Sequence, residues 1–208
     1  MNSTFDPSPG GPPSGRQRIG VTTAAIRLCD LAAALVGGTI CLPVVGVLAL
    51  AIRLDSPGPA LFRQERVGRN RRVFTCLKLR TMAQGTLSVG THEASSASIT
   101  RLGHWLRRLK LDELPQLWNV LRGEMSLVGP RPCLPSQVEL IEARRVRGVY
   151  AVRPGITGPA QVAGLDMSTP VELADADAVW ADAPNLPSYM KLILVTVFGK
   201  GRGDAIRG

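Results

Sequence analysis

The longest apolar stretch of the chain covers residues 28–54 and is interrupted only by Asp30 near its start and Arg53 near its end. A helix needs about 20 apolar residues to cross the hydrocarbon core of a bilayer, so this stretch predicts a membrane-inserted helix. The residues before it are rich in Pro, Gly and Ser, which predicts a disordered tail. The pattern thus divides the chain into a tail, a membrane helix and a folded domain, at residues 1–19, 20–54 and 55–208.

Two features of the apolar stretch argue against a helix that simply crosses the bilayer. Pro43 lies in its middle, where a proline removes a backbone hydrogen bond and kinks a helix. Arginines lie on both sides of the stretch, and positive charge stays on the cytoplasmic side of a membrane. This favours a re-entrant helix that bends at Leu42 and Pro43 and returns to the same face. A kinked helix that crosses the bilayer stays open as the alternative, because transmembrane helices tolerate proline.

Short-range patterns in the domain predict one hairpin followed by helices. Residues 61–67 and 73–82 read as two basic strands around a short turn. Apolar residues recur at helical spacing over residues 99–109, and a second helix is expected to begin at Asp112. Capping-box matches at residues 136–139 and 169–172 predict two further helix starts. An apolar helix is expected at residues 189–198, either in the headgroup region or against the core. The fold class expected is α+β, with a mostly helical domain that carries a short β-hairpin.

Composition narrows the classes of function. The 208 residues are 45% hydrophobic, which is enough for a packed core, and the formal net charge of +9 implies an anionic partner. That partner can be nucleic acid, lipid headgroups or a phosphorylated substrate. The four cysteines are scattered, and neither they nor the two histidines have the spacing of a metal site. The sequence therefore argues against a disulfide scaffold and against a zinc site.

The candidate chemistry lies in the neighbouring carboxylates Asp112 and Glu113. Acidic residues at a helix start are common as caps, so the pair alone is weak evidence for catalysis. Its surroundings strengthen the case, because Arg131 lies on a rigid Gly-Pro-Arg-Pro turn and Arg153 precedes a second such turn. Carboxylates that hold magnesium or attack phosphorus, with arginines that neutralise charge, are what phosphoryl transfer needs.

The string LDELPQLWNVLRGEMSLVGPRP, at residues 111–132, resembles the bacterial sugar transferases, which are monotopic polyprenyl-phosphate phosphoglycosyl transferases. The resemblance continues in VRPGITGPAQVAG at residues 152–164, in residues 74–82 with their Lys-x-Arg-Thr-Met ending, and at residues 27–30. It covers nearly everything from Arg27 to the last helix. The chain resembles the minimal, single-domain form of the family.

The resemblance implies a covalent mechanism. Asp112 is expected to attack the sugar-bearing phosphorus of a UDP-sugar, releasing UMP and leaving a phospho-sugar on the enzyme. Polyprenyl (undecaprenyl) phosphate then accepts that group. Asp112 and Glu113 are expected to hold Mg²⁺, and Glu113 either serves only the metal or also acts on the acceptor's proton. The residues expected around phosphate are Lys78, Arg107, Arg131 and Arg153, of which Lys78 competes with Arg80 on the same strand face.

The resemblance also implies a location and marks two departures. Family members keep both ends of a re-entrant helix at the cytoplasmic face of the bacterial inner membrane, where the catalytic domain begins the assembly of a surface glycan. A serine usually precedes the proline at the bend, whereas this chain has Leu42, so a hydroxyl that satisfies backbone groups is missing. Pro159 stands where an aromatic residue is common, so contacts to substrate are expected to differ there.

Two functions of other classes compete with the transferase. A membrane-anchored nucleic-acid-binding protein agrees with the charge, but the sequence lacks a recognition-helix or zinc-finger signature and only 4% of its residues are aromatic. A non-catalytic scaffold agrees with the fold, but the intact Asp112, Glu113 and Arg131 argue against it. We therefore expect a UDP-sugar, polyprenyl phosphate and membrane lipid as partners, and no nucleic acid. The sugar, the pathway and the oligomeric state, dimer included, stay open.

Overall fold

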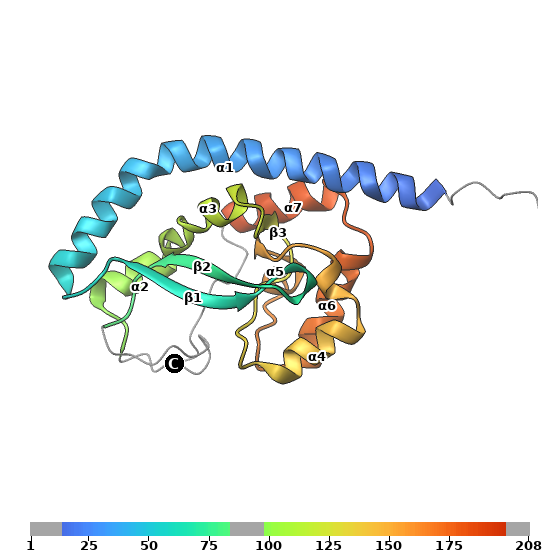
Figure 1. The fold of residues 1–208 in the computed structure, drawn as a ribbon. Coiled ribbons are helices and arrows are strands. Elements are labelled where there is room, and N and C mark those ends of the chain that lie inside the picture. The colour runs from blue at the N-terminus through green and yellow to red at the C-terminus, as the bar shows by residue number, and fades with distance from the viewer. Residues whose placement is uncertain (1–13, 84–97, 199–208) are drawn as a thin grey trace, which may run out of the picture.

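The computed structural model describes residues 14–83 and 98–198 of the chain, and Figure 1 shows one long helix arching over a smaller domain. This helix, α1 (Ser14–Asp55), begins before residue 20, where the membrane helix was predicted to start. Most of the predicted tail, residues 1–13, lies outside the described residues. Helices and two small sheets form the domain, which confirms the expected mixture of α and β structure with helix in excess.

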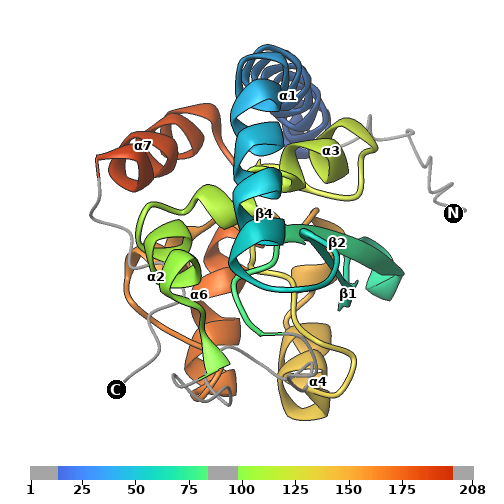
Figure 2. The ribbon, with the colours of Figure 1, turned by 90° about the vertical axis from the view of Figure 1, so that its left-hand side faces the viewer.

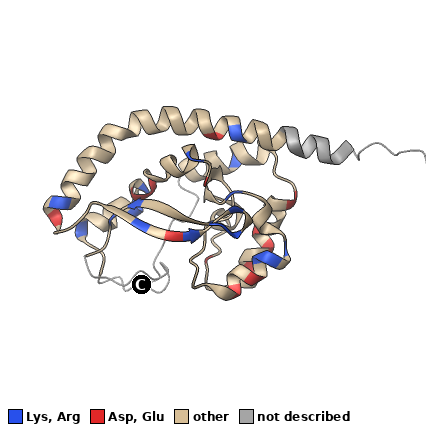
Figure 3. Ribbon diagram, viewed as in Figure 1, with Lys and Arg blue, Asp and Glu red and all other residues tan. Residues whose placement is uncertain are grey.

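Helix α1 is apolar and largely exposed. Its stretch Thr22–Asp55 is long and apolar enough to cross a membrane, and only 6% of the apolar window within it is buried against the rest of the protein. Leu35 is 62% exposed and Leu42 is 70% exposed. Figure 3 shows the middle of α1 without charged residues. The predicted apolar N-terminal helix is confirmed, and so much exposed apolar surface is consistent with association with a membrane.

The helix continues through the expected bend. Pro43 lies inside α1, and the axis curves towards the C-terminal end of the helix in Figure 1. Thr39 Oγ1 donates a hydrogen bond to Leu35 O at 2.8 Å, one turn before the proline. Bonds of this kind bend helices slightly, and Pro43 removes a further backbone bond. The structure thus has a curved helix at Leu42 and Pro43 rather than two helices.

The predicted hairpin is confirmed. Strands β1 (Leu61–Val67) and β2 (Val73–Leu79) pair antiparallel, although β2 ends before residue 82. The turn between them holds a short 3-10 helix, η1 (Arg69–Arg71). Within it Asn70 has a φ of 55°, a left-handed conformation that asparagine tolerates better than most residues.

The helix predicted to begin at Asp112 is instead two elements. Helix α2 (Arg101–Arg108) is followed by a 3-10 turn, η3 (Leu111–Glu113), and then by α3 (Gln116–Leu121). Pro115 has no N–H with which to continue an α-helix back to Leu111 O, and the N–H of Leu114 bonds that oxygen at 3.3 Å instead. The prediction was therefore wrong about the helix start, and Asp112 lies on a tight turn.

A second sheet was not predicted at all. Strands β3 (Ser126–Val128) and β4 (Gly155–Thr157) pair in parallel. A Cβ added to Gly155 would lie 2.0 Å from the Gly129 backbone nitrogen, so only glycine lets these two segments approach. This contact brings the Gly-Pro-Arg-Pro turn next to the segment that follows Arg153.

The remaining helices follow in chain order as α4 (Val138–Val146), η4 (Val149–Ala151), α5 (Pro159–Val162), α6 (Pro170–Asp182) and α7 (Leu186–Val197). The capping-box matches predicted the starts of α4 and α6 to within two residues. The predicted hydrogen bonds are absent, however, because neither cap residue, Gln137 or Thr169, makes a side-chain cap bond. At α7 the cap is Asn185, whose side chain accepts from Ser188 N at 2.9 Å.

Helix α1 is packed on the domain along one side. Figure 2 looks along it and shows α3 and α7 on either side beneath it. Ile26, Ala34 and Ile52 of α1 are buried, each in a different hydrophobic cluster of the domain. Because these contacts lie along much of the helix, its position relative to the domain is fixed at several points.

Candidate active site

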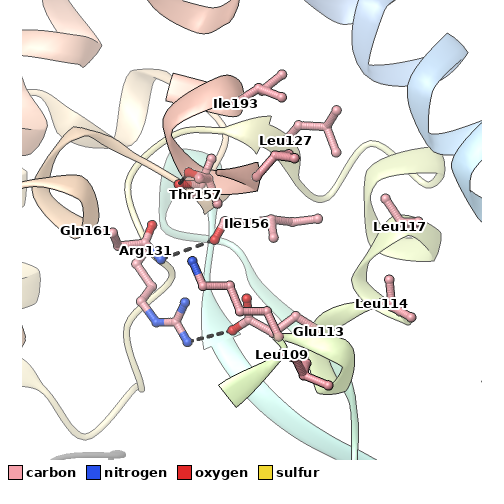
Figure 4. A pocket seen from close by; sticks show the side chains of 13 residues that line it. Leu109, Glu113, Leu114, Leu117, Leu127, Arg131, Ile156, Thr157, Gln161 and Ile193 are labelled. Atoms are coloured by element: carbon pink, nitrogen blue, oxygen red, sulfur yellow. Dashed lines mark hydrogen bonds and ion pairs between the residues drawn. The ribbon is translucent and has the colours of Figure 1, made fainter. Parts of the chain in front are cut away.

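The side chain of Glu113 forms ion pairs with two basic side chains. Its Oε1 accepts a hydrogen bond from Lys78 Nζ at 3.1 Å and from Arg131 Nη2 at 2.9 Å. The side chains are only 13–16% exposed, so the pairs are shielded from water and stronger than ion pairs on the surface. They come from strand β2, turn η3 and the segment after β3, and Figure 4 shows Arg131 and Glu113 pointing towards each other. The structure therefore brings together three of the residues predicted for the site.

The strand end near Lys78 carries a second basic residue with a different function. Arg80 Nη1 donates to Pro57 O at 2.6 Å, and its Nη2 donates to Ser56 O at 2.7 Å. These bonds attach the hairpin to the segment that follows α1. Of the two competing residues, Lys78 of β2 therefore faces Glu113, and Arg80, just beyond the strand, is structural.

A buried ion pair between Arg144 and Asp177 holds the main chain of Arg131 in place. Arg144 donates from Nε and Nη2 to Asp177 Oδ2 at 2.9 and 2.6 Å, and from Nη1 to the main-chain oxygen of Arg131 at 2.8 Å. Arg144 and Asp177 are each 1% exposed. Burial raises the pKa of the Asp177 carboxyl, while Arg144 opposes that change. Sequence reasoning missed this pair, because its members lie on α4 and α6 without any local motif.

Asp112 is buried beside this cluster. It is 5% exposed, and its turn η3 contacts β2 and α2. The left-handed conformation of Lys110, with a φ of 57°, lets the chain leave α2 and enter the turn. As a result the two carboxylates differ, since Asp112 lies inside the protein and Glu113 borders a cavity.

Arg107 has an unsatisfied donor near the same turn. Its Nε donates to Thr81 Oγ1 at 2.9 Å, while its buried Nη1 has no hydrogen-bond partner among the described residues. A buried guanidinium nitrogen without a partner is costly, and a phosphate oxygen would satisfy it. Arg107 is on the last turn of α2, which contacts η3, so the predicted association with Asp112 and Glu113 agrees with the geometry.

Arg153 lies elsewhere. Its Nε donates to Gly123 O at 2.9 Å, and its side chain lines a different cavity with Arg27 and Asp30 of α1. Burial, followed by the charges of Arg27 and Arg69, lowers the pKa of Arg153. The structure thus does not bring Arg153 to the cluster around Glu113.

The cavity at Glu113 has a volume of about 330 Å³, and its lining combines charged and apolar side chains. The charged and amide side chains are Lys110, Glu113, Arg131 and Gln161. The rest of the wall is mostly apolar and is formed by Leu109, Leu114, Leu117, Leu127, Ile156, Ile193 and Val197, together with Thr157 and Thr196. Figure 4 shows side chains converging from the residues on either side of η3 and from α3, β3, β4 and α7. We call this space the reaction cavity.

Gln161 is a residue of this cavity that sequence reasoning missed. Its Nε2 donates to Ile156 O at 3.2 Å, and its Oε1 is buried without a hydrogen-bond partner among the described residues. The signal was present, since Gln161 lies in the Gly-x-Ala-Gln-Val run that carried the family resemblance. Pro159 occupies the first position of α5, where its fixed φ suits a helix start.

The metal-binding capacity of the site is limited to neighbouring carboxylates. Among the described residues, no group of three or more His, Cys, Asp or Glu side chains is placed to hold a metal. Mg²⁺ is commonly held by only one or two carboxylates together with substrate phosphates. The pair Asp112 and Glu113 fits that type of site and does not fit a metal cage built entirely from protein. The four cysteines are unpaired.

Comparison with known proteins agrees with this chemistry. The family model for bacterial sugar transferases matches residues 21–201. A UDP-glucose:undecaprenyl-phosphate glucose-1-phosphate transferase of Caulobacter vibrioides is 42% identical over 198 residues, which cover 91% of this chain and 73% of that protein. The uncharacterized sugar transferase EpsL of Bacillus subtilis is 36% identical, covering 82% of this chain and 84% of that protein.

A third relative acts on another sugar according to its name. It is the UDP-N-acetylgalactosamine-undecaprenyl-phosphate N-acetylgalactosaminephosphotransferase of Aeromonas hydrophila, and it is 41% identical over 65% of this chain. The chain spans 33% of the length of that protein. Because the family model matches most of the length of this chain, the chain belongs to the bacterial sugar transferase family.

Proposed function

We propose that the chain transfers a sugar 1-phosphate from a UDP-sugar to undecaprenyl phosphate, releases UMP and thereby begins the assembly of a surface glycan. The observation that carries the proposal is the reaction cavity, which combines the charged side chains of Glu113 and Arg131 with a mostly apolar wall. A polyprenyl phosphate likewise combines an anionic head with a long apolar chain. The names of the relatives supply the reaction and the donor class.

The first step uses the buried carboxylate. An oxygen of Asp112 attacks the sugar-bearing phosphorus, the bond from that phosphorus to the bridging oxygen breaks, and UMP leaves with the electron pair. The phospho-sugar is then bound covalently to Asp112. Burial supports this role because few water molecules can compete for the phosphorus or hydrolyse the intermediate.

The second step returns the enzyme to its starting state. An oxygen of undecaprenyl phosphate attacks the same phosphorus, the bond to Asp112 breaks, and the carboxylate is restored. Two half-reactions that share one covalent intermediate predict ping-pong kinetics. The apolar wall, including Leu109 and Val197, would contact the first isoprene units of the acceptor.

Cations around the carboxylates stabilise the transferring phosphoryl group. Arg131 is already fixed by Arg144, and Lys78 lies on a paired strand, so neither needs to reorganise during the reaction. The unpartnered Nη1 of Arg107 is available for a phosphate oxygen. Mg²⁺, held by Asp112 and Glu113 with the substrate diphosphate, would neutralise part of the negative charge on the phosphates. A carboxylate that already binds two cations suits the role of a ligand better than that of a base, so we assign Glu113 to the metal.

The exposed apolar surface of α1 supports a position at the membrane. We propose that α1 inserts as a re-entrant helix that bends at Leu42 and Pro43, with the domain at the cytoplasmic face of the inner membrane. Trp105 of α2 and Trp118 of α3 are 61% and 55% exposed, and tryptophan is enriched at membrane interfaces. These side chains support short helices that lie against the headgroups beside α1.

The test is release of UMP by the detergent-purified chain, with Mg²⁺, undecaprenyl phosphate and a panel of UDP-sugars. Without the lipid we expect at most one UMP per enzyme, and with the lipid continuous release. The variant Asp112→Asn is measured alongside. Its matched control is Asp175→Asn, because the Asp175 carboxylate pairs with Arg147 at the surface. No UMP from folded protein with any UDP-sugar would contradict the proposal. The sugar that gives the fastest release identifies the donor.

A further inference from the structure

A second cavity, with a volume of about 310 Å³, lies where the start of α1 meets the domain. Arginines reach it from three separate parts of the chain: Arg27 from α1, Arg69 from the hairpin turn and Arg153 from the segment before β4. Asp30 is the one carboxylate that lines it, so positive charge exceeds negative charge in the lining. We call this space the arginine cavity.

The single carboxylate of Asp30 neutralises only part of the charge of the three arginines. Asp30 Oδ1 accepts hydrogen bonds from Ser126 Oγ, Leu127 N and Tyr189 Oη, each at 2.9 Å. Its nearest contact with an arginine is 4.0 Å, between Oδ2 and Arg27 Nη1. Asp30 therefore joins α1 to β3 and α7, and the repulsion among the arginines remains. Burial, and then the charges of Arg27 and Arg69, lower the pKa of Arg153, while Asp30 opposes that change.

The structure holds two of these arginines in position. Arg27 donates from Nη1 to Val120 O at 2.8 Å and from Nη2 to Leu121 O at 3.3 Å. Arg153 donates from Nε to Gly123 O, which lies just beyond the same helix end. Both guanidinium groups thus rest on the carbonyls at the end of α3, where the helix dipole favours cations. Arg153 uses one of its five N–H donors in these bonds, so its terminal nitrogens are available to a ligand.

The arginine cavity is separate from the reaction cavity. Ser126 and Val128 of β3 line the arginine cavity, whereas Leu127 between them lines the reaction cavity. Successive residues of a strand point to opposite faces, so the two cavities lie on opposite sides of β3. A ligand in the arginine cavity is consequently not in place to react at Asp112 or Glu113.

We infer that the arginine cavity binds a phosphate group that the reaction does not consume, carried by an anionic phospholipid or by a soluble phosphate. Paired guanidinium groups, already oriented, are the preferred partners of phosphate oxygens. The position of the cavity supports the lipid source, because Thr23 and Ala24 in its wall belong to the apolar helix that would enter the membrane. A lipid bound here would fix the depth of α1 and stabilise its junction with β3. The inference does not depend on the proposed transfer reaction.

The test uses Trp180, which lines the arginine cavity, as a fluorescent reporter. The full chain carries Trp105→Phe and Trp118→Phe, so that Trp180 is its one tryptophan, and is held in neutral detergent. Three probes are titrated separately: short-chain phosphatidylglycerol, short-chain phosphatidylcholine and inorganic phosphate. Arg69→Gln and Arg153→Gln are compared with Arg63→Gln, a control on an exposed arginine of β1. Arg69 is exposed, so its variant tests binding without a risk to folding.

We expect a saturable change in Trp180 emission, with binding about tenfold weaker in Arg69→Gln and Arg153→Gln, as loss of one charged hydrogen bond predicts. Arg63→Gln should bind like the parent. Tighter binding of phosphatidylglycerol than of the other probes identifies a lipid, and equal binding of inorganic phosphate identifies a soluble anion. The inference is overturned if no probe gives a saturable change, or if both cavity variants bind as tightly as the control.

Discussion

The reaction cavity and the arginine cavity both present arginines, but different groups hold those arginines. In the reaction cavity, Arg131 binds the carboxylate of Glu113, which also binds Lys78 of β2 outside the lining. In the arginine cavity, Arg27 and Arg153 bind neutral carbonyls at the end of α3 and keep their excess charge. A site whose charge changes during a reaction needs both positive and negative groups, so that it is stable before and after the change. A site with excess positive charge suits an anion that stays bound unchanged. The contrast therefore supports our proposals of chemistry in the first cavity and of binding alone in the second.

The largest effect that sharpens this contrast is expected at Asp112. Asp112→Asn removes the nucleophile while keeping the size of the side chain, so turnover should fall on the order of 1000-fold or more. Mass spectrometry of the parent, mixed with a UDP-sugar without acceptor, should detect a phospho-sugar on the peptide that contains Asp112. The variant should lack that adduct. Normal turnover in Asp112→Asn would refute the covalent mechanism.

The next effect concerns the ion pair behind Arg131. Asp177→Leu leaves the charge of Arg144 buried without its partner, so the free energy of unfolding should fall by about 3–5 kcal/mol. Changing both residues, as Arg144→Met with Asp177→Leu, should recover most of that loss because no buried charge is left. Denaturant unfolding in detergent measures both values, with Asp175→Asn at the surface as the control.

Measurements of activity in the Arg144 and Asp177 variants separate an effect on the position of Arg131 from an effect on stability. The double variant should stay poor in kcat/KM even where its stability recovers, because Arg131 O has lost the donor Arg144 Nη1. If stability and kcat/KM recovered together, the ion pair would stabilise the fold without positioning Arg131. Such a result would weaken the view that the reaction cavity is preorganised.

A direct comparison of the two cavities uses one arginine from each. Arg131→Gln should lower kcat/KM about 100-fold, as expected when a donor to a developing charge is removed from a shielded site. The loss of kcat/KM in Arg153→Gln should be at least about tenfold smaller, because a separate binding site acts on the reaction only through the position of the protein in the membrane. Steady-state UMP release measures both. Equal losses would show that the two arginines serve the same step.

Local patterns account for the parts of the fold that were predicted. The apolar run of α1, the strand composition of the hairpin and the starts of α4 and α6 each depend on neighbours in sequence. The sheet of β3 and β4 has three residues per strand, and its pairing depends on the contact between Gly129 and Gly155, which no local pattern reveals. The start of the second helix was misplaced because Pro115 decides where the helical bonds begin.

The candidate site was predicted through the family resemblance more than through spacing. Lys78, Glu113 and Arg131 do meet, although they are far apart in the chain. Arg153 was grouped with them because a sequence gives residue types without distances, and the structure places it on the other side of β3. The ion pair of Arg144 and Asp177 left no signal in the sequence. Whether charged residues share a cavity is decided by tertiary packing, which here follows from the approach of two glycines.

The smallest effect tests one apolar residue in the wall of the reaction cavity. Leu109 is 58% exposed yet lines the cavity, so Leu109→Ser can alter binding with little effect on the core. Losing part of a leucine contact with the acceptor should raise the KM for undecaprenyl phosphate about fivefold, an energy of about 1 kcal/mol. The KM for the UDP-sugar should stay the same, as should both values in Val138→Ser, a control on α4 whose side chain is also exposed. A rise in the donor KM instead would place the sugar, rather than the polyprenyl chain, against this wall.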